Sequence, residues 1–366
     1  MGAITRAFAN NITTGGKFDA TDMTGSLPAS NISNASCTNV TSVPALVATS
    51  TVASDPPSPD LGQMWYNTSQ GILKAYKLSD GSWATGGSLN NGLVGNAGFG
   101  TQTASVSAGG TKSPGITNVV EHYNGSSWTN ATAIPSATDS MGSGGTQTAG
   151  LVFGGQRPPN TNTSFEYDGS SWTAGGTLNT TRRDLIGAGT QTAGLAAFGA
   201  IDPPFSAEAE TYDGTSWTNI AEGNTTARSR AGGGVQTSAM AYGGYGPSNY
   251  TANAETWDGS SWTEVSNISS IRGIMGGGGT SNTDQITFGG YGGPPGSQRY
   301  TNTEFWNGSA WTELNDLSVA RSTKQSSPSG PTSSQIYAGG HTPPANYTTT
   351  TEEWTKSNVS QRLGTT

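Results

Sequence analysis

The sequence predicts an all-β fold made of one repeated unit, because two short phrases recur along the chain. The first, Tyr-Asp-Gly-Ser-Ser-Trp at residues 167–172, returns in variant form and places its last tryptophan at 83, 128, 172, 217, 262 and 311. The second is a short strand that ends in Gly-Gly or Gly-Ala at 110, 155, 200, 244, 290 and 340. A period of about 45 residues is the size of one four-stranded propeller blade. We therefore expect a six-bladed β-propeller.

Each expected blade reads as four strands in order. A glycine-rich strand leads to the strand that ends in the glycine pair, a loop of variable length follows, and a third strand ends in Tyr or Trp. An Asp-Gly or Asn-Gly turn then leads to the tryptophan strand, because these residues tolerate the positive φ of a tight hairpin. Asp168, Asp213 and Asp258 are therefore interpreted as turn formers. The expected blades are 89–133, 134–178, 179–222, 223–268, 269–317 and 318–366.

Glycine and aromatic residues have separate expected places in each blade. Glycines near the ring axis let neighbouring strands approach closely. The two aromatics of each repeat should fill the wider gap between blade faces, where burying each contributes roughly 2–3 kcal/mol. An aromatic stripe that stacks on sugars is the alternative for these residues.

Residues 1–60 differ in kind from the repeats. They are rich in Ser, Thr, Asn and Ala, with few apolar residues, and they end in the proline-rich segment 55–60. Such a segment cannot bury enough apolar surface to order alone. We expect an N-terminal arm that is held by a larger assembly and ends in a stiff linker. The alternative is an arm that folds back on its own propeller.

Residues 61–88 are expected to form a hairpin and a closing strand. The strands are predicted at 63–67, 71–76 and 82–85, separated by turn residues. The last repeat has Trp354 but no second tryptophan after it. We expect the Trp83 strand to pair with that repeat and close the ring, which removes exposed sheet edges. A seventh, incomplete N-terminal blade is the alternative.

Composition excludes several classes of function. The net charge is −8 and only 11% of residues are charged, so no basic surface for nucleic acid is expected. No apolar stretch is long enough to insert into a membrane, and we expect no signal peptide. The single cysteine, Cys37, excludes an intrachain disulfide. Asn-x-Ser/Thr triplets are interpreted as by-products of the composition.

The sequence offers no evident catalytic or metal site. The only histidines, His122 and His341, are five repeats apart. No paired carboxylates recur at a spacing typical of glycoside hydrolysis, although a pair that meets across the ring axis would escape notice. We therefore expect no enzyme activity, no metal and no cofactor.

One set of residues is predicted to form a binding face. In a four-stranded meander, the loops after the second and fourth strands leave from the same side of the ring. Arginine guanidinium groups bind carboxylates, and tyrosines stack on sugars or peptides. The alternative is that each arginine binds strand-end carbonyls of its own or the next blade. The candidates are Arg157, Arg182, Arg183, Phe205, Arg228, Tyr245, Tyr250, Arg272, Tyr291, Arg321 and Tyr347.

The order of glycine pair, Tyr and Trp over residues 89–355 resembles the kelch repeat. The uniform Asp-Gly-Ser-Ser-Trp turn departs from the eukaryotic pattern. Together with the segments 20–28 and 62–68, it resembles virion proteins of tailed phages, notably marine ones. Galactose oxidase, a kelch-type copper enzyme, needs two histidines and a cysteine-linked tyrosine, which this chain does not supply. The turn is also one residue shorter than the Asp box of propeller sialidases.

The resemblance implies a non-enzymatic virion protein, namely a fibre, tail or capsid-surface component. Its expected task is adhesion to a host-surface glycan or protein, or decoration of the particle. Other virion proteins are the expected partners of residues 1–60, with a homo-oligomer as a further option. A glycan-active enzyme and a purely structural spacer are the alternatives.

Overall fold

The computed structural model describes residues 50–57, 63–202, 204–292, 298–323, 328–342 and 347–363. Every regular element in this part of the chain is a β-strand. The chain forms two compact units, one spanning Asp80–Lys356 and the other combining residues up to Ser79 with those from Ser357 onward. Most of the arm predicted at residues 1–60 lies outside the described residues.

The smaller unit contains one four-stranded sheet in the order β1-β2-β3-β31. Its strands are β1 (Ser50–Val52), β2 (Met64–Asn67), β3 (Ile72–Leu78) and β31 (Asn358–Leu363). β2 and β3 lie where the sequence predicts a hairpin. The C-terminal strand β31 runs antiparallel to β3. The larger unit therefore begins at Asp80, before the expected boundary at 89, and ends at Lys356, before the expected boundary at 366.

Asp55 ties the smaller unit together. Its carboxylate accepts hydrogen bonds from the Trp65 indole at 3.0 Å and the Asn67 amide at 2.8 Å, and Lys74 Nζ lies 2.6 Å away. These contacts lower the pKa of Asp55 to about 2, with the Lys74 bond as the largest cause. The segment expected to be only a linker thus contributes a structural residue.

The larger unit contains five antiparallel four-stranded sheets and one three-stranded sheet among the described residues. Sheet 1 consists of β5 (Ala97–Thr101), β6 (Ala104–Ala108), β9 (Val120–Tyr123) and β10 (Trp128–Ala131). Sheet 2 consists of β11 (Gly142–Thr146), β12 (Ala149–Phe153), β13 (Ser164–Tyr167) and β14 (Trp172–Ala174). Sheet 3 consists of β15 (Ile186–Thr190), β16 (Ala193–Ala200), β17 (Phe205–Tyr212) and β18 (Trp217–Ile220).

The remaining sheets follow the same plan. Sheet 4 consists of β19 (Ala231–Val235), β20 (Ser238–Tyr242), β21 (Ala254–Trp257) and β22 (Trp262–Val265). Sheet 5 consists of β23 (Gly276–Ser281), β24 (Asp284–Phe288), β27 (Thr303–Trp306) and β28 (Trp311–Leu314). Sheet 6 consists of β29 (Ser334–Ala338), β30 (Thr351–Thr355) and β4 (Ser82–Thr85). Two short pairs lie in connecting loops, β7 (Thr111–Lys112) with β8 (Gly115–Ile116), and β25 (Tyr291–Gly292) with β26 (Gln298–Arg299).

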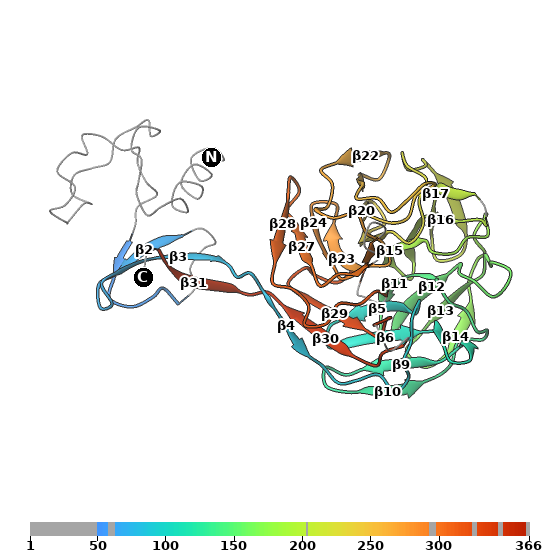
Figure 1. The fold of residues 1–366 in the computed structure, drawn as a ribbon, viewed down its shortest axis with the longest axis horizontal. Coiled ribbons are helices and arrows are strands. Elements are labelled where there is room, and N and C mark those ends of the chain that lie inside the picture. Colours follow the sequence, from blue (N-terminus) through green and yellow to red (C-terminus); the bar gives the residue numbers. More distant parts are fainter. Residues whose placement is uncertain are drawn as a thin grey trace. The chain divides into compact units, whose positions relative to one another are not determined.

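The sheets of the larger unit follow one another around a ring (Figure 1). Their innermost strands contact each other in sequence, β5 with β11, β11 with β15, β15 with β19 and β19 with β23. β4 pairs with β30 and places Trp83 opposite Trp354, which is the closing pair that the sequence predicts. The architecture is all-β and propeller-like.

The recurring turn has the conformation expected from its sequence. In sheet 2, the Asp168 carboxylate accepts hydrogen bonds from the backbone N–H groups of Ser170 and Ser171 at 2.8 and 2.7 Å, and Gly169 has a φ of +94°. Tyr167 and Trp172 then stand opposite each other with ring centroids 4.4 Å apart. Asp213 and Asp258 make the same turn contacts. These aspartates are turn formers, as predicted.

The turn between the first two strands connects neighbouring sheets. The Gln147 side-chain amide donates to the carbonyls of Ser105 and Tyr123 in the preceding sheet, both at 3.0 Å. Gln102, Gln191 and Gln236 make equivalent pairs of bonds. These glutamines, each in the turn between the first two strands of its sheet, therefore join one sheet to the next.

Candidate functional site

Residues with positive φ form an open backbone ring where the chain enters the innermost strands of sheets 1 to 5. They are Gly95, Ser140, Asp184, Ser229 and Ile274, with φ between 54° and 69°. After Gly95, each N–H donates to the carbonyl of the previous member at 2.8 or 2.9 Å, from Ser140 to Gly95 and onward to Ile274. Non-glycine residues in this conformation cost about 1–3 kcal/mol each and are enriched at functional sites. We call this set the backbone ring.

The backbone ring lines a cavity of about 440 Å³, which we call the axial cavity. Connections that enter or leave sheets 1 to 5 supply its wall. Besides the ring, the lining residues are Val94, Thr111, Asp139, Arg228, Tyr245 and Tyr250.

Pro328 and Ser329, shortly before β29, contact three of the innermost strands. The Pro328 carbonyl accepts hydrogen bonds from the Gly234 and Gly279 N–H groups at 3.0 and 3.3 Å. The Ser329 hydroxyl bonds to Gly189 at 3.1 Å. The hollow left beside Pro328 measures about 30 Å³, enough for one or two waters. Among the described residues, the axial cavity is therefore the larger of the two spaces.

Asp139 presents a carboxylate with one fixed oxygen. Its Oδ2 accepts a hydrogen bond from the Thr111 hydroxyl at 2.6 Å. Its Oδ1 is buried and has no hydrogen-bond partner among the described residues. Burial raises the pKa of Asp139, and the nearby negative charge of Asp184 adds to the shift. The unpaired oxygen is therefore enclosed by protein, although the residue belongs to the cavity wall.

Asp184 is held by two arginines. Its Oδ2 lies 3.3 Å from Arg228 Nη1 and 3.4 Å from Arg183 Nη1. Arg183 also contacts Asp202 at 2.8 Å, and this bond is the main cause that raises the pKa of Arg183 and lowers that of Asp202. Asp184 is also close enough to Asp139 for its charge to act on that carboxyl.

Four aromatic side chains form a row beside the cavity. The ring centroids of Phe205 and Tyr245 are 5.7 Å apart, those of Tyr245 and Tyr250 are 5.0 Å apart, and those of Tyr250 and Tyr291 are 5.5 Å apart. The Arg228 guanidinium lies over Phe205 and Tyr245, 5.5 and 5.4 Å from their centroids. The structure thus brings together five of the predicted candidates, which we call the aromatic row and its arginine.

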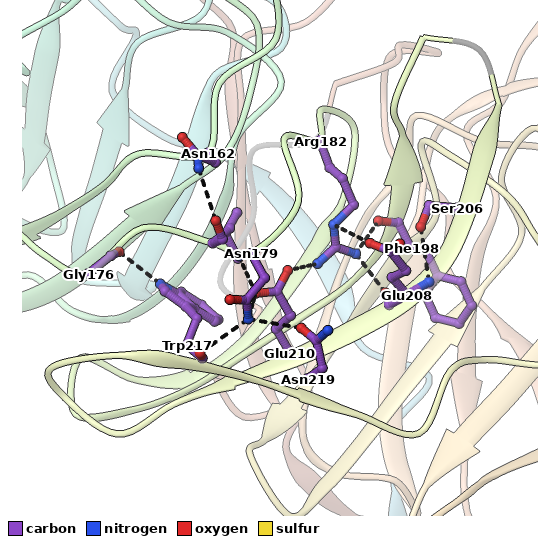
Figure 2. Close-up of polar contacts among 11 residues, drawn as sticks. Asn162, Gly176, Asn179, Arg182, Phe198, Ser206, Glu208, Glu210, Trp217 and Asn219 are labelled. Carbon is purple, nitrogen blue, oxygen red and sulfur yellow. Dashed lines mark hydrogen bonds and ion pairs between the residues drawn. The ribbon is translucent and has the colours of Figure 1, made fainter.

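Arg182, Arg272 and Arg321 lie elsewhere. All three are fully buried, so the prediction that they line an exposed rim is wrong. Arg182 Nη2 lies 2.7 Å from Glu210 Oε1, and Nη1 donates to the Phe198 and Glu208 carbonyls at 2.9 and 2.6 Å (Figure 2). Arg272 pairs with Glu304 at 2.6 Å and Arg321 with Glu352 at 2.8 Å. A buried glutamate on the third strand draws each guanidinium inward, because an unpaired buried charge is costly.

Arg230 is of the same kind although it is not among the predicted candidates, and the candidate Arg157 packs against a neighbouring aromatic ring. Arg230 is also fully buried and pairs with Glu255 at 2.6 Å. The sequence signal that indicates a buried arginine partner is a glutamate two residues before the aromatic at the end of the third strand, as in Glu255 before Trp257. Phe165 replaces that glutamate in sheet 2, and Arg157 lies over its ring at 5.6 Å while donating to Thr138 at 2.8 Å. Tyr347 is half-buried, with its backbone carbonyl beside Gly92.

Comparison with known proteins supports the fold. No family model matches the chain, and no curated protein sequence matches it. A solved structure titled "Structure of YjhT" aligns with a TM-score of 0.63 over 75% of this chain and 99% of that one, at 15% identity. At this identity the likeness is one of fold alone. Within the described residues, no helix is long and apolar enough to cross a membrane.

Proposed function

We propose that the chain is a kelch-like, six-bladed β-propeller that serves as a non-enzymatic binding module of a phage virion. The six sheets would be the six blades, with the sixth completed by β4 from the N-terminal side. The virion assignment rests on the resemblance of the repeats, the segment 62–68 and the segment 20–28 to phage proteins. Host-surface adhesion or decoration of the particle is the proposed task.

The axial cavity and the aromatic row are the observation that carries the binding role. Tyr245 and Tyr250 line the cavity and also belong to the row. Their rings pack edge to face, and Arg228 fixes Tyr245 from one side. A concave site with a few fixed polar groups and rigid aromatics is the usual form of a small-ligand site. The proposed binding face therefore consists of these residues.

Attachment to the particle is proposed through the N-terminal side of the chain. Residues 1–49 and 58–62 lie outside the described residues, so the proposal rests on their composition. The smaller unit is built from both the N-terminal and the C-terminal parts of the described chain, and Asp55 holds its strands together. It is the part of the chain proposed to join other virion proteins. A homo-oligomer fits the same role. No nucleic acid or membrane partner is proposed.

A glycan-active enzyme is the second candidate, and the pair Asp139 and Asp184 favours it. A carboxyl with a raised pKa beside a charged one is the arrangement that general acid catalysis uses. Against it, Asp184 is 7% exposed and engaged by two arginines, which leaves it poorly placed to act as a nucleophile or base. We therefore favour binding without turnover.

Binding of labelled protein to a panel of marine bacteria and their purified polysaccharides tests the proposal. The variant Arg228→Ala/Tyr250→Ala should weaken binding by at least about ten-fold, because aromatic and arginine anchors dominate such contacts. Asp168→Asn is the matched control, since Asn124 and Asn307 already occupy this turn in other repeats.

Three outcomes would contradict parts of the proposal. Unchanged binding by the double variant would place the binding face elsewhere. Absence of binding to every strain and polysaccharide would favour the structural spacer. Release of oligosaccharide from a polysaccharide, lost in Asp139→Asn, would establish the enzyme.

A further inference from the structure

We infer that the axial cavity binds the anionic group of an acidic sugar, a carboxylate or a sulfate ester, through Arg228 and Tyr250. This inference rests on the proposed binding function and names the ligand class of that site.

Arg228 supplies a partly free guanidinium at the cavity wall. Its side chain lines the cavity and is 29% exposed. Of the five N–H donors of a guanidinium, only one on Nη1 is used, in a long contact of 3.3 Å with Asp184 Oδ2. Nε is enclosed by protein, whereas Nη2 is not enclosed and has no partner among the described residues. Nη2 can therefore donate to a ligand without first breaking an internal bond.

Aromatic rings hold this guanidinium in place. It lies over Phe205 and Tyr245, 5.5 and 5.4 Å from their ring centroids. Tyr245 in turn packs edge to face against Tyr250, with centroids 5.0 Å apart. Because the charge is already positioned, binding costs less side-chain entropy than it would with a mobile arginine.

Tyr250 adds a hydroxyl donor to the same wall. It lines the cavity and is half-buried, so its ring is held while solvent still reaches it. Burial is the largest cause that raises the pKa of Tyr250, so its phenol stays protonated at neutral pH and can donate a hydrogen bond. A guanidinium and a phenol at one wall are donors suited to an anionic oxygen group.

The carboxylates of the cavity wall offer little to a ligand. Asp139 Oδ1 is enclosed by protein, and Oδ2 accepts a hydrogen bond from the Thr111 hydroxyl. The Asp184 side chain is 10% exposed, and its Oδ2 contacts two guanidinium groups. Solvent therefore reaches the donors of Arg228 and Tyr250 more readily than these acceptors. A ligand that accepts hydrogen bonds fits this wall better than one that must donate them.

Charge opposes an anionic ligand only at Asp139. Arg228 pairs with Asp184 at 3.3 Å and Arg183 pairs with Asp202 at 2.8 Å, so these four charges balance. Burial raises the pKa of Asp139, so it is protonated more readily than an ordinary aspartate, but its ionised form would repel a bound anion. Removal of the Asp139 charge should therefore strengthen binding, whereas removal of the Arg228 charge should weaken it.

Ligand-detected NMR and calorimetry on the full chain test the inference. The acidic probes are glucuronic acid, galacturonic acid and galactose 6-sulfate, and glucose and galactose are their neutral counterparts. At least one acidic sugar should bind at least about ten-fold more tightly than its neutral counterpart. Its affinity should fall as salt is added, because screening weakens the attraction between exposed charges. Comparison of the uronic acids with the sulfated sugar identifies the anionic group.

Two variants should change the affinity for the acidic sugar in opposite directions. Arg228→Gln should weaken binding by at least about ten-fold, since it removes the charged donor. Asp184 keeps its contact with Arg183 in this variant, so the fold should tolerate the change. Asp139→Asn keeps an oxygen for Thr111 and should strengthen binding several-fold, because it removes the like charge.

Each of these variants has a charge-matched control. Arg157→Gln removes the same positive charge, but the Arg157 guanidinium lies over Phe165 and the residue does not line the axial cavity. Asp168→Asn removes the same negative charge at an exposed turn. Both controls should leave the affinity unchanged.

A further variant keeps the test valid if Arg228→Gln does not fold. Tyr250→Phe removes only the hydroxyl and keeps the ring packing, so it should weaken binding by roughly ten-fold. A melting temperature within about 3 °C of the parent shows that a variant is folded.

The inference is overturned if neutral sugars bind as tightly as acidic ones, if no acidic sugar binds, or if Tyr250→Phe leaves the affinity unchanged. Equal effects of Arg228→Gln and Arg157→Gln, or weaker binding by Asp139→Asn, would also overturn it. Its failure is distinguishable from failure of the proposed function. A chain that binds cells through Arg228 and Tyr250, but is not displaced by acidic sugars, keeps the binding role and loses the ligand class. A chain that binds no cells and no polysaccharide loses the role itself.

Discussion

Four buried guanidinium groups, each paired with a buried glutamate, recur from sheet 3 to sheet 6. Each glutamate also accepts a hydrogen bond from the connection before its sheet, as Glu210 does from the Asn179 N–H at 2.7 Å. In sheet 1, Glu121 has no arginine among its donors in the described part of the chain and instead accepts from the backbone and side-chain amides of Asn90 and Asn91. These carboxylates hold the connections between sheets in place, so removing one partner should be costly.

Arg272→Met tests that cost. It leaves Glu304 buried without its cation, and we expect a loss of about 3–5 kcal/mol in the free energy of unfolding. The double variant Arg272→Met/Glu304→Met removes both charges and should recover a large part of the loss. Urea denaturation measures both. A single variant as stable as the parent would show that the pair contributes nothing net.

His122 stands where two other repeats have a glutamate, Glu166 and Glu353. The Tyr212 hydroxyl donates to Glu166 at 2.6 Å, and the Tyr123 hydroxyl donates to Glu353. His122 instead lies against Tyr167 with ring centroids 5.5 Å apart, and neither its Nε2 nor the Tyr167 hydroxyl has a partner among the described residues. We expect His122→Glu to add about 1 kcal/mol at pH 7, because it restores the bond.

The matched test is Tyr167→Phe, which removes a hydroxyl without a partner. It should be near neutral in the parent and should cancel the gain in His122→Glu. A gain that survives Tyr167→Phe would refute the explanation.

Acid sensitivity should trace in part to the same histidine. Burial lowers the pKa of His122 from its ordinary value of 6.5, so the unfolded chain binds this proton more readily than the folded one. The stability that depends on neutral His122 is complete above about pH 6.5 and is lost as the pH falls below it. Melting temperatures between pH 7.5 and 5 should fall less steeply in His122→Gln than in the parent.

At the scale of the element, the innermost strands are close-packed around the segment before β29. A Cβ on Gly233 in β19 would lie 1.9 Å from the Pro328 carbonyl oxygen, and both are backbone positions with no flexible side chain to yield. Gly233→Ala should therefore lower the melting temperature by several degrees. Gly115→Ala in β8 is the control, because a Cβ there meets nothing within 4 Å. Equal melting temperatures for the two variants would contradict this packing.

The elements show what the sequence can predict. Strand positions and the Asp168 turn follow from local chemistry, since an Asp-Gly pair between alternating residues has few other conformations. The directions of the arginines do not. Arg228 lies over aromatics at the cavity, whereas Arg230, two residues on, is drawn inward by Glu255, which is far from it in the sequence. The proximity of Asp139 to Asp184 likewise depends on how sheets 2 and 3 pack side by side. Nothing in residues 358–363 indicates that they pair with β3.

At the scale of the whole molecule, closure of the ring depends on one short strand. β4 brings Trp83 against Trp354 and Phe288, with centroid distances of 5.4 and 4.8 Å, and the Trp83 indole donates to the Thr303 hydroxyl at 2.9 Å. One side chain from the N-terminal side thus joins sheets 5 and 6. Without it, β30 would present an open edge.

Two truncated chains isolate the contribution of this strand. Residues 80–356 form the larger unit and should melt as one cooperative transition close to that of the full chain. Residues 89–356 lack β4 and expose the β30 edge together with the Trp354 and Phe288 faces, so this chain should melt many degrees lower and aggregate on heating. Calorimetry with light scattering measures both effects. Because the two chains differ only in residues 80–88, equal melting temperatures would mean that the ring holds without its closing strand.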